Sequence, residues 1–337
     1  MEFNLIERYF APLGAGLPAG DLGIGDDGAL ISIAPDHQLV VVTDTLVCGV
    51  HFPEETAAAD IAWKALAVNL SDLAAMGATP LGFSLAVSLP PNLAQNEAWM
   101  SAFSQGFADL IAKLGLPIPL VGGDTTRSSL LTLTVSAKGL VRSGQALLRS
   151  SAQIGDLIVV TEQLGDAALG LLLALNRLPE DERSLLTEMQ QKDAILALNR
   201  PWPQVGFAQS LFPLVRSAID VSDGLLQDLG HLLKASSKMS GQSFGARIEL
   251  EAVPCSRALR LLCDKQPDYW RLPLSGGDDY QLCLSVAPER WPQLQQLARR
   301  MGVSLSQIGQ ITDSGVTEVL WFGKPFSVEN YHGYDHF

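Results

Sequence analysis

The chain has 337 residues, of which 47% are hydrophobic and 18% are charged, and this composition suits a globular protein of two domains. Its formal net charge of -13 argues against a nucleic-acid-binding protein, because such proteins need a basic surface. A phosphorylated small substrate remains possible, because bridging Mg²⁺ can join carboxylates to phosphates.

Helical and strand patterns alternate along the first half of the chain. The residues from Leu131 to Val141 alternate apolar and polar side chains, which predicts a half-buried antiparallel strand. The elements predicted up to that point are a helix at Glu2–Tyr9, a strand at Gln38–Thr45, a helix at Asp60–Met76, a strand at Leu81–Leu89, a helix at Glu97–Leu114, a strand at Ile118–Val121 and the strand at Leu131–Val141.

The polar, turn-prone stretch from Val141 to Ser151 indicates a domain boundary, so we expect domains at residues 1–145 and 146–337. Strands and helices alternate again after it, and the whole pattern predicts two α/β (α+β) units with partly antiparallel sheets. The further elements predicted are strands at Leu157–Thr161, Ala218–Val221, Arg247–Leu250, Gln281–Val286, Leu305–Ile311 and Val319–Phe322, and helices at Asp166–Asn176, Asp181–Leu198, Leu225–Ser236, Ser256–Asp264 and Glu289–Met301.

Cysteine spacing and hydropathy predict a cytoplasmic protein with no membrane partner, and the acidic charge predicts no nucleic-acid partner. The four cysteines show no C-x-x-C spacing, which favours buried thiols in a reducing compartment. Residues 1–10 lack the apolar segment of a signal peptide. The longest apolar run, Ala167–Leu175, is too short to span a bilayer.

Aspartate stands beside Gly, Ser or Thr at the edge of an apolar segment in five places. Any one of them is explained by a turn or a helix cap, and Ser222 and Asp223 in particular could cap the helix that starts at Leu225, leaving N–H groups for an anion. Five together indicate oxygen ligands for a hard cation. The five motifs are Gly25-Asp26-Asp27-Gly28, Thr43-Asp44-Thr45, Asn69-Leu70-Ser71-Asp72, Gly122-Gly123-Asp124-Thr125-Thr126 and Asp220-Val221-Ser222-Asp223-Gly224.

These motifs, with three further blocks, resemble those of bacterial thiamine-monophosphate kinases almost from end to end. The wider superfamily includes aminoimidazole ribonucleotide synthetase, selenophosphate synthetase and a hydrogenase maturation factor. The run Asn69–Gly77 and the aromatic tail Gly333–Phe337 point to the thiamine branch. The other blocks are His51-Phe52 and Ser275-Gly276-Gly277-Asp278-Asp279-Tyr280.

The resemblance implies a kinase that converts ATP and thiamine monophosphate to ADP and thiamine diphosphate. It implies a homodimer, formed through the mixed sheet of an N-terminal ATP- and magnesium-binding domain, with a C-terminal α/β domain. By motif position it implies Mg²⁺ ligands at Asp27, Val42 (carbonyl), Thr43, Asp44, Asp72, Asp124, Asp220 and Asp223, ATP contacts at Gly123, Asp124, Arg149 and Ser222, and thiamine phosphate contacts at His51, Asp278 and Tyr331.

Two positions depart from the family pattern. Asp278 stands where the family usually has Glu, which shortens its reach by one methylene group, and Tyr331 stands where we expect Trp or another aromatic ring. Other assignments remain open, namely a different ATP-dependent synthetase of this superfamily or a non-catalytic protein that binds Mg²⁺ or nucleotide. A selenophosphate synthetase would need a reactive Cys in the glycine-rich stretch Gly14–Gly28, which has none.

No motif for a catalytic base or nucleophile accompanies the carboxylates. The sequence lacks a Walker motif, the kinase H-R-D and D-F-G sets, G-x-S-x-G and H-E-x-x-H. A phosphate acceptor is already ionised at neutral pH, because its second pKa is about 6. We therefore expect direct in-line transfer with several Mg²⁺ ions and no general base.

Overall fold

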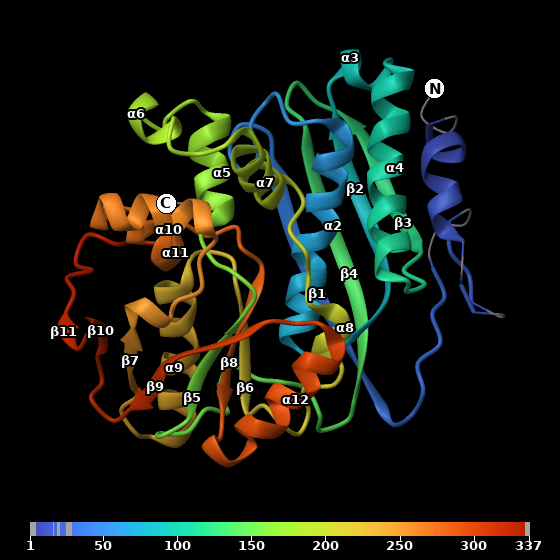
Figure 1. The fold of residues 1–337 in the computed structure, drawn as a ribbon. Helices are drawn as coiled ribbons and strands as arrows, with labels where there is room; N and C mark the ends of the chain where they lie inside the picture. Colours follow the sequence, from blue (N-terminus) through green and yellow to red (C-terminus); the bar gives the residue numbers. More distant parts are fainter. Residues whose placement is uncertain (1–4, 16, 19–20, 25–28, 334–337) are drawn as a thin grey trace. The chain divides into compact units, whose positions relative to one another are not determined.

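The chain forms two compact units, one of residues 1–73 and 78–144 and one of residues 74–77 and 145–337. They are seen here in a computed structural model, which describes residues 5–15, 17–18, 21–24 and 29–333 (Figure 1). The predicted ligand Asp27, the Gly25–Gly28 motif and the end of the aromatic tail lie outside the described residues.

The N-terminal unit is built on a four-stranded mixed sheet in the order β1-β4-β2-β3. β4 is antiparallel to both β1 and β2, as its alternating sequence predicted, and β3 is parallel to β2. In Figure 1, α2 and α4 lie along one face of this sheet. The elements are η1 (Ile6–Phe10), η2 (Ala11–Gly14), β1 (His37–Val47), α2 (Ala58–Ala75), β2 (Thr79–Leu89), α3 (Pro91–Ala94), α4 (Glu97–Leu114), β3 (Leu120–Arg127) and β4 (Thr132–Arg142).

Local sequence explains where α4 begins, where it ends and which face it buries. The side chain of Asn96 accepts the backbone N–H of Trp99 at 3.1 Å, and Gly115 ends the helix with a φ of 66°. Phe103 and Phe107 are fully buried, and the Phe107 ring lies 5.6 Å from that of Phe83 in β2. The aromatic face of α4 thus anchors the helix to the sheet.

Strand β3 is longer than the sequence pattern predicted. We expected a strand at Ile118–Val121 with the Gly122-Gly123-Asp124 motif at its edge, but the strand runs from Leu120 to Arg127 through both glycines. It continues because β2 offers a full set of pairing partners, from Ser84 opposite Gly122 to Leu89 opposite Arg127. Asp124 consequently lies within an edge strand and not at a loop tip.

The C-terminal unit holds a seven-stranded sheet in the order β11-β10-β7-β9-β5-β8-β6, in which only the β10–β7 pairing is parallel. Its strands are β5 (Leu157–Thr161), β6 (Ser217–Val221), β7 (Gly245–Glu249), β8 (Gln281–Val286), β9 (Leu305–Thr312), β10 (Thr317–Trp321) and β11 (Lys324–Pro325). Its helices are α5 (Asp166–Ala174), α6 (Glu180–Arg183), α7 (Glu188–Asn199), α8 (Val205–Ala208), α9 (Leu225–Ser240), α10 (Arg257–Lys265), α11 (Arg271–Ser275) and α12 (Trp291–Met301), with 3₁₀ turns η3 (Leu250–Ala252), η4 (Pro267–Trp270) and η5 (Pro288–Arg290).

Apolar side chains of this sheet and of α5, α9 and α10 form one continuous core. Ile219 and Val221 of β6 pack in the same cluster as Leu225 and Leu229 of α9, all nearly inaccessible to water. The loop that joins β6 to α9 is therefore held at both ends by buried residues. Ser222 and Asp223 lie in this loop, and Asp220 is the last but one residue of β6.

The single helix predicted at Asp181–Leu198 is wrong, because two helices occupy that stretch. α6 ends at Arg183, and Thr187 starts α7 with a capping box in which it accepts the N–H of Gln190. The cap motif interrupts the helical pattern that the sequence suggested.

All four cysteines are free thiols, with Cys263 and Cys283 buried and Cys48 and Cys255 half-buried. Within the described ranges, no helix combines the length and the apolar character that a bilayer crossing requires.

Candidate functional site

In the N-terminal unit, β1 and α2 bring candidate ligands together. The backbone N–H of Asp44 donates to the Oδ1 of Asn69 at 3.2 Å, which fixes the outer edge of β1 against α2. Asp72 follows Asn69 by three residues and so lies on the same side of the helix. Both Asp44 and Asp72 are half-buried. Two of the predicted magnesium ligands are thus neighbours at the β1 edge of the sheet.

The predicted metal-ligand oxygens of Thr43 and Val42 already make hydrogen bonds within the protein. The Thr43 hydroxyl lies 2.8 Å from the Val42 carbonyl oxygen and 3.0 Å from the Ser136 hydroxyl of β4. A carbonyl oxygen has two lone pairs and a hydroxyl oxygen can accept while it donates, so these contacts leave both atoms able to bind a metal.

His51 follows β1 in a loop whose shape fixes the orientation of its ring. The backbone N–H of Val47 donates to Nδ1 of His51 at 3.0 Å, so a neutral ring carries its proton on Nε2. The ammonium group of Lys64, which is 1% exposed, donates to the His51 carbonyl at 3.2 Å. An imidazole held in this way can donate from Nε2 to an anionic oxygen.

Asp124 lies at the opposite edge of the same sheet. Asp44 pairs with Val135, Val135 pairs with Leu85, and Asp124 follows the residue that pairs with Leu85. Asp124 is therefore one residue beyond the position level with Asp44, and the two are separated by β4 and β2, which is three strand spacings or about 14 Å. Oxygens that share one Mg²⁺ lie within about 4 Å of each other. Asp44 and Asp124 of one chain therefore do not bind the same ion.

The two glycines before Asp124 have different structural roles. A Cβ on Gly123 would overlap the backbone of Leu85 in β2, whereas a Cβ on Gly122 would meet nothing within 4 Å. Gly123 is therefore required by the close approach of two strands, in addition to any contact with a nucleotide.

We expect Gly123→Ala to destabilise the N-terminal unit by about 1–3 kcal/mol or more, because the added methyl group has no space. Gly122→Ala should change the free energy of unfolding by less than about 0.5 kcal/mol. Chemical denaturation of the two variants tests this difference directly. Equal stability would show that β3 moves away from β2 without cost.

In the C-terminal unit, the segment from Asp220 at the end of β6 to Gly224 is shaped by a carboxylate that lies in the following helix. The Oδ2 atom of Asp228 accepts the backbone N–H groups of Ser222, Asp223 and Gly224 at 3.0, 3.0 and 3.2 Å. Burial, together with the neighbouring carboxylate of Asp220, raises the pKa of Asp228 to about 7. The alternative in which Ser222 or Asp223 caps the helix is wrong, because the N-cap residue is Gly224 and has no capping side chain.

A second loop, residues 275–280, is hydrogen-bonded to the first. The N–H of Asp278 donates to the Ser222 carbonyl and the N–H of Tyr280 to the Val221 carbonyl, both at 2.8 Å. Asp278 and Tyr280 have φ values of 62° and 50°, and the Tyr280 hydroxyl donates to Asp278 Oδ1 at 3.1 Å. Left-handed backbone at non-glycine residues is strained and clusters at functional sites.

The remaining predicted residues of this unit lie apart from one another. Tyr331 packs on the core with its ring 6.1 Å from that of Phe326, and burial raises the pKa of its hydroxyl. Arg149 is exposed, and its backbone carbonyl accepts the hydroxyl of Ser236 at 2.9 Å.

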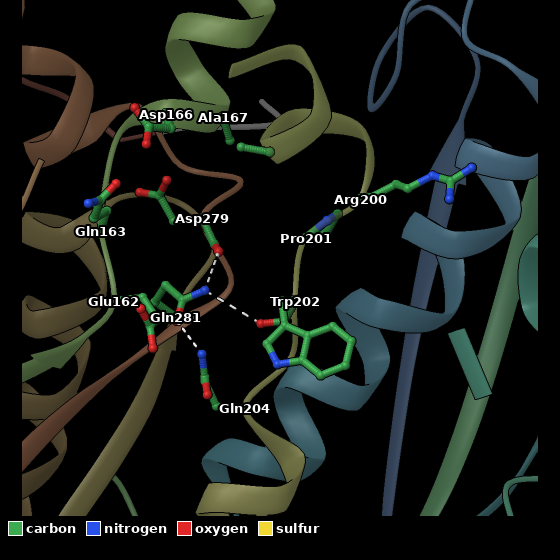
Figure 2. Close-up of a pocket in the computed structure, with 11 residues that line it drawn as sticks. Glu162, Gln163, Asp166, Ala167, Arg200, Pro201, Trp202, Gln204, Asp279 and Gln281 are labelled. Atoms are coloured by element: carbon green, nitrogen blue, oxygen red, sulfur yellow. Dashed lines mark hydrogen bonds between the residues drawn. The ribbon is translucent and has the colours of Figure 1, made fainter. Parts of the chain in front are cut away.

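A pocket of about 350 Å³ opens in the C-terminal unit, and none of the predicted site residues lines it (Figure 2). Gln204 donates to Gln281 at 2.9 Å, and Gln281 donates to the carbonyls of Asp279 and Trp202. The carboxylate of Asp279 accepts the N–H of Gly165 at the start of α5, and burial raises its pKa well above the usual value. Asp279 thus has a structural partner, whereas its neighbour Asp278 belongs to the strained loop.

No group of three or more His, Cys, Asp or Glu side chains suited to a metal occurs among the residues that the structure describes. The candidate ligands instead form small sets, namely Asp44 with Asp72, Asp124 alone, and Asp220 with Asp223. Mg²⁺ keeps several waters and binds through one or two carboxylates plus substrate phosphates, so such sets match its chemistry.

Sequence reasoning missed two residues that shape the candidate site, namely Lys64, which holds the His51 loop, and Asp228, which holds the segment after β6. Each is a charged residue in a helix, and both are at most 3% exposed. The available signal was a single charged residue among apolar ones in a helix. If such a side chain is buried, it needs a partner, because burying an unpaired charge is energetically costly.

The chain matches the model of the AIR synthase related proteins, with the N-terminal domain at residues 25–141 and the C-terminal domain at residues 153–322. It is 42% identical to the thiamine-monophosphate kinase of Escherichia coli K12, over 100% of this chain and 98% of the relative. A crystal structure of the thiamine-monophosphate kinase from Stenotrophomonas maltophilia K279a is 42% identical with a TM-score of 0.82, covering 96% of this chain and 98% of that one. AaThiL complexed with AMPPCP and TMP is 26% identical with a TM-score of 0.74, over 100% and 97% of the two chains.

Proposed function

This chain belongs to the thiamine-monophosphate kinase family, and we propose that it transfers the terminal phosphoryl group of ATP to the phosphate of thiamine monophosphate. The products are thiamine diphosphate and ADP. The observation that carries this proposal is the match to kinases of this name over the whole chain. The related complex with AMPPCP and TMP supports the same pair of substrates.

The carboxylate sets described above fit Mg²⁺ as the accompanying metal. All donors are oxygens, which hard cations prefer, and no Cys or His is needed. We propose Asp44, Asp72 and Asp124 as ligands from the N-terminal unit and Asp220 and Asp223 from the C-terminal unit. Asp27, Val42 and Thr43 stay proposals from the family resemblance. When bound, Mg²⁺ supplies neutralisation of the phosphate charges.

The other residues bind and orient the substrates. The Nε2–H of His51 suits the phosphate of thiamine monophosphate, since Nδ1 is already held by a backbone N–H. Asp278 suits the cationic thiamine portion, with its carboxylate oriented by Tyr280. Tyr331 offers a ring for stacking, and Gly123, Arg149 and Ser222 are proposed contacts for ATP. The chain needs no proton acceptor, because the attacking phosphate oxygen is ionised at neutral pH.

Transfer in a single step predicts inversion of configuration at the γ-phosphorus. ATP made chiral at that phosphorus should give thiamine diphosphate of inverted configuration, as read by stereochemical analysis of the product. Retention would contradict direct transfer and require a phosphoenzyme.

The N-terminal sheet is the proposed surface for a homodimer. Leu39 and Val41 of β1 are 44% and 57% exposed, and exposed apolar side chains on a sheet favour association. β1 and β3 are both edge strands of this sheet, and pairing or covering of edges is a common solution to their exposure. A dimer that brings β3 of one copy to β1 of the other would place Asp124 beside Asp44.

An assay of ADP release tests the function. Thiamine monophosphate should support ADP release, whereas thiamine and aminoimidazole precursors should not. Release with a precursor would indicate another synthetase of the superfamily. ATP binding without turnover of any of these compounds would indicate a non-catalytic protein. We propose a cytoplasmic location, because four free cysteines suit a reducing compartment.

A further inference from the structure

We propose that Asp228 is a positioning residue that turns the loop of residues 220–224 into a cation-binding loop and keeps it from binding anions. The inference deepens the proposed function, because it rests on Asp220 and Asp223 as magnesium ligands. It starts from one buried carboxylate oxygen that accepts three consecutive N–H groups, those of Ser222, Asp223 and Gly224.

The three N–H groups belong to the turn that starts α9, a helix of four turns. A helix start with free N–H groups attracts anions, because the helix dipole and the donors both favour negative charge. Here all three N–H groups already donate to the carboxylate of Asp228. Nucleotide phosphates therefore do not bind this backbone directly, and the loop presents net negative charge.

The backbone at Gly224 is closely confined by its surroundings. Gly224 has a φ of 117°, and a Cβ at that position would lie 2.6 Å from the Cα of Ser275. Gly224 thus packs against Ser275 on one side and donates to Asp228 on the other. Losing the carboxylate would leave three donors without a partner, and the turn would rearrange to satisfy them.

The hydrogen bond between Asp228 and Ser222 also connects Asp228 to the loop of residues 275–280. Ser222, whose N–H is held by Asp228, accepts the N–H of Asp278 through its carbonyl. Asp223 is also oriented by Gln227, whose amide donates to Asp223 Oδ2 at 3.3 Å. Asp228 therefore holds a unit that includes the proposed metal ligand Asp223 and the proposed substrate contact Asp278.

The test compares Asp228→Ala, Asp228→Asn and Thr187→Ala in the full chain. All three hydrogen bonds go to one oxygen, which the amide oxygen of Asn can replace. Thr187→Ala is the matched control, because it also removes a side-chain oxygen that accepts a backbone N–H at the start of a helix in the same unit, but it lies outside the proposed site. Binding of Mn²⁺ in the presence of ADP, measured by electron paramagnetic resonance, requires no turnover, and comparison with an Asp223→Ala variant isolates the contribution of this loop.

For Asp228→Ala we expect the dissociation constant of Mn²⁺ to rise by about tenfold to a hundredfold, as for other residues that orient metal ligands. Asp228→Asn should restore most of the affinity, and Thr187→Ala should bind like wild type. Should Asp228→Ala fail to fold, Asp228→Asn must still bind Mn²⁺ more tightly than an Asp223→Ala variant.

Wild-type affinity in folded Asp228→Ala, or equal losses in Asp228→Asn and Asp223→Ala, would overturn the proposal. Failure of the kinase function is a separate result. It would leave wild-type Mn²⁺ binding intact without any turnover of thiamine monophosphate.

Discussion

Asp44→Ala and Asp124→Ala should each lower kcat by at least about 10²–10³-fold, the usual cost of removing one preorganised electrostatic group. Each carboxylate is proposed to hold a cation against the phosphates of the two anionic substrates, whose mutual repulsion is the main obstacle to transfer. Steady-state assays with saturating ATP and thiamine monophosphate measure the loss.

Both variants should remain folded. Asp124 is exposed and Asp44 half-buried, so neither substitution should change the free energy of unfolding by more than about 1 kcal/mol. Asp36→Ala is the control, because Asp36 precedes β1 and pairs with the neighbouring His37 in an exposed position outside the proposed site. Normal turnover in either Asp44→Ala or Asp124→Ala would remove that residue from the proposed metal set.

Mixed dimers of these two inactive variants should regain activity. The strand order separates Asp44 from Asp124 within one chain, so a site that uses both takes Asp124 from a second copy. In a dimer of one Asp44→Ala chain and one Asp124→Ala chain, one of the two sites then has both carboxylates. Random mixing makes half of the dimers mixed, so about a quarter of the wild-type activity should return.

The control for this experiment pairs Asp44→Ala with Asp72→Ala. These two residues lie at the same edge of the sheet, next to Asn69, so mixing should restore nothing. Co-expression with two different affinity tags isolates the mixed dimers. If purified mixed dimers of Asp44→Ala and Asp124→Ala stay inactive, the two carboxylates act within one copy at separate ions.

Local patterns predicted most of the elements, and non-local packing explains the differences. The alternation from Leu131 to Val141 was sufficient for β4, because one face of that strand is buried under helices. The length of β3 depended on its partner β2, which no residue within β3 specifies. Thr187 split a predicted helix through a capping motif that apolar periodicity does not detect.

The sequence predicted which residue types form the candidate site, but not where those residues lie relative to one another. Motifs identified the carboxylates, but Thr43-Asp44 and Gly123-Asp124 look equivalent along the chain. Their separation follows from the order of strands in the sheet, which depends on long-range pairing. Asp228 carried no motif of its own, since one acidic residue in an amphipathic helix usually faces water.

The placement of Asp44 and Asp124 at opposite edges has a consequence for how the protein behaves on dilution. If each centre needs two copies, the rate per mole of chain is constant only while the copies stay associated. Below the dissociation constant of the pair, specific activity falls with protein concentration, and added substrate restores it by drawing the copies together.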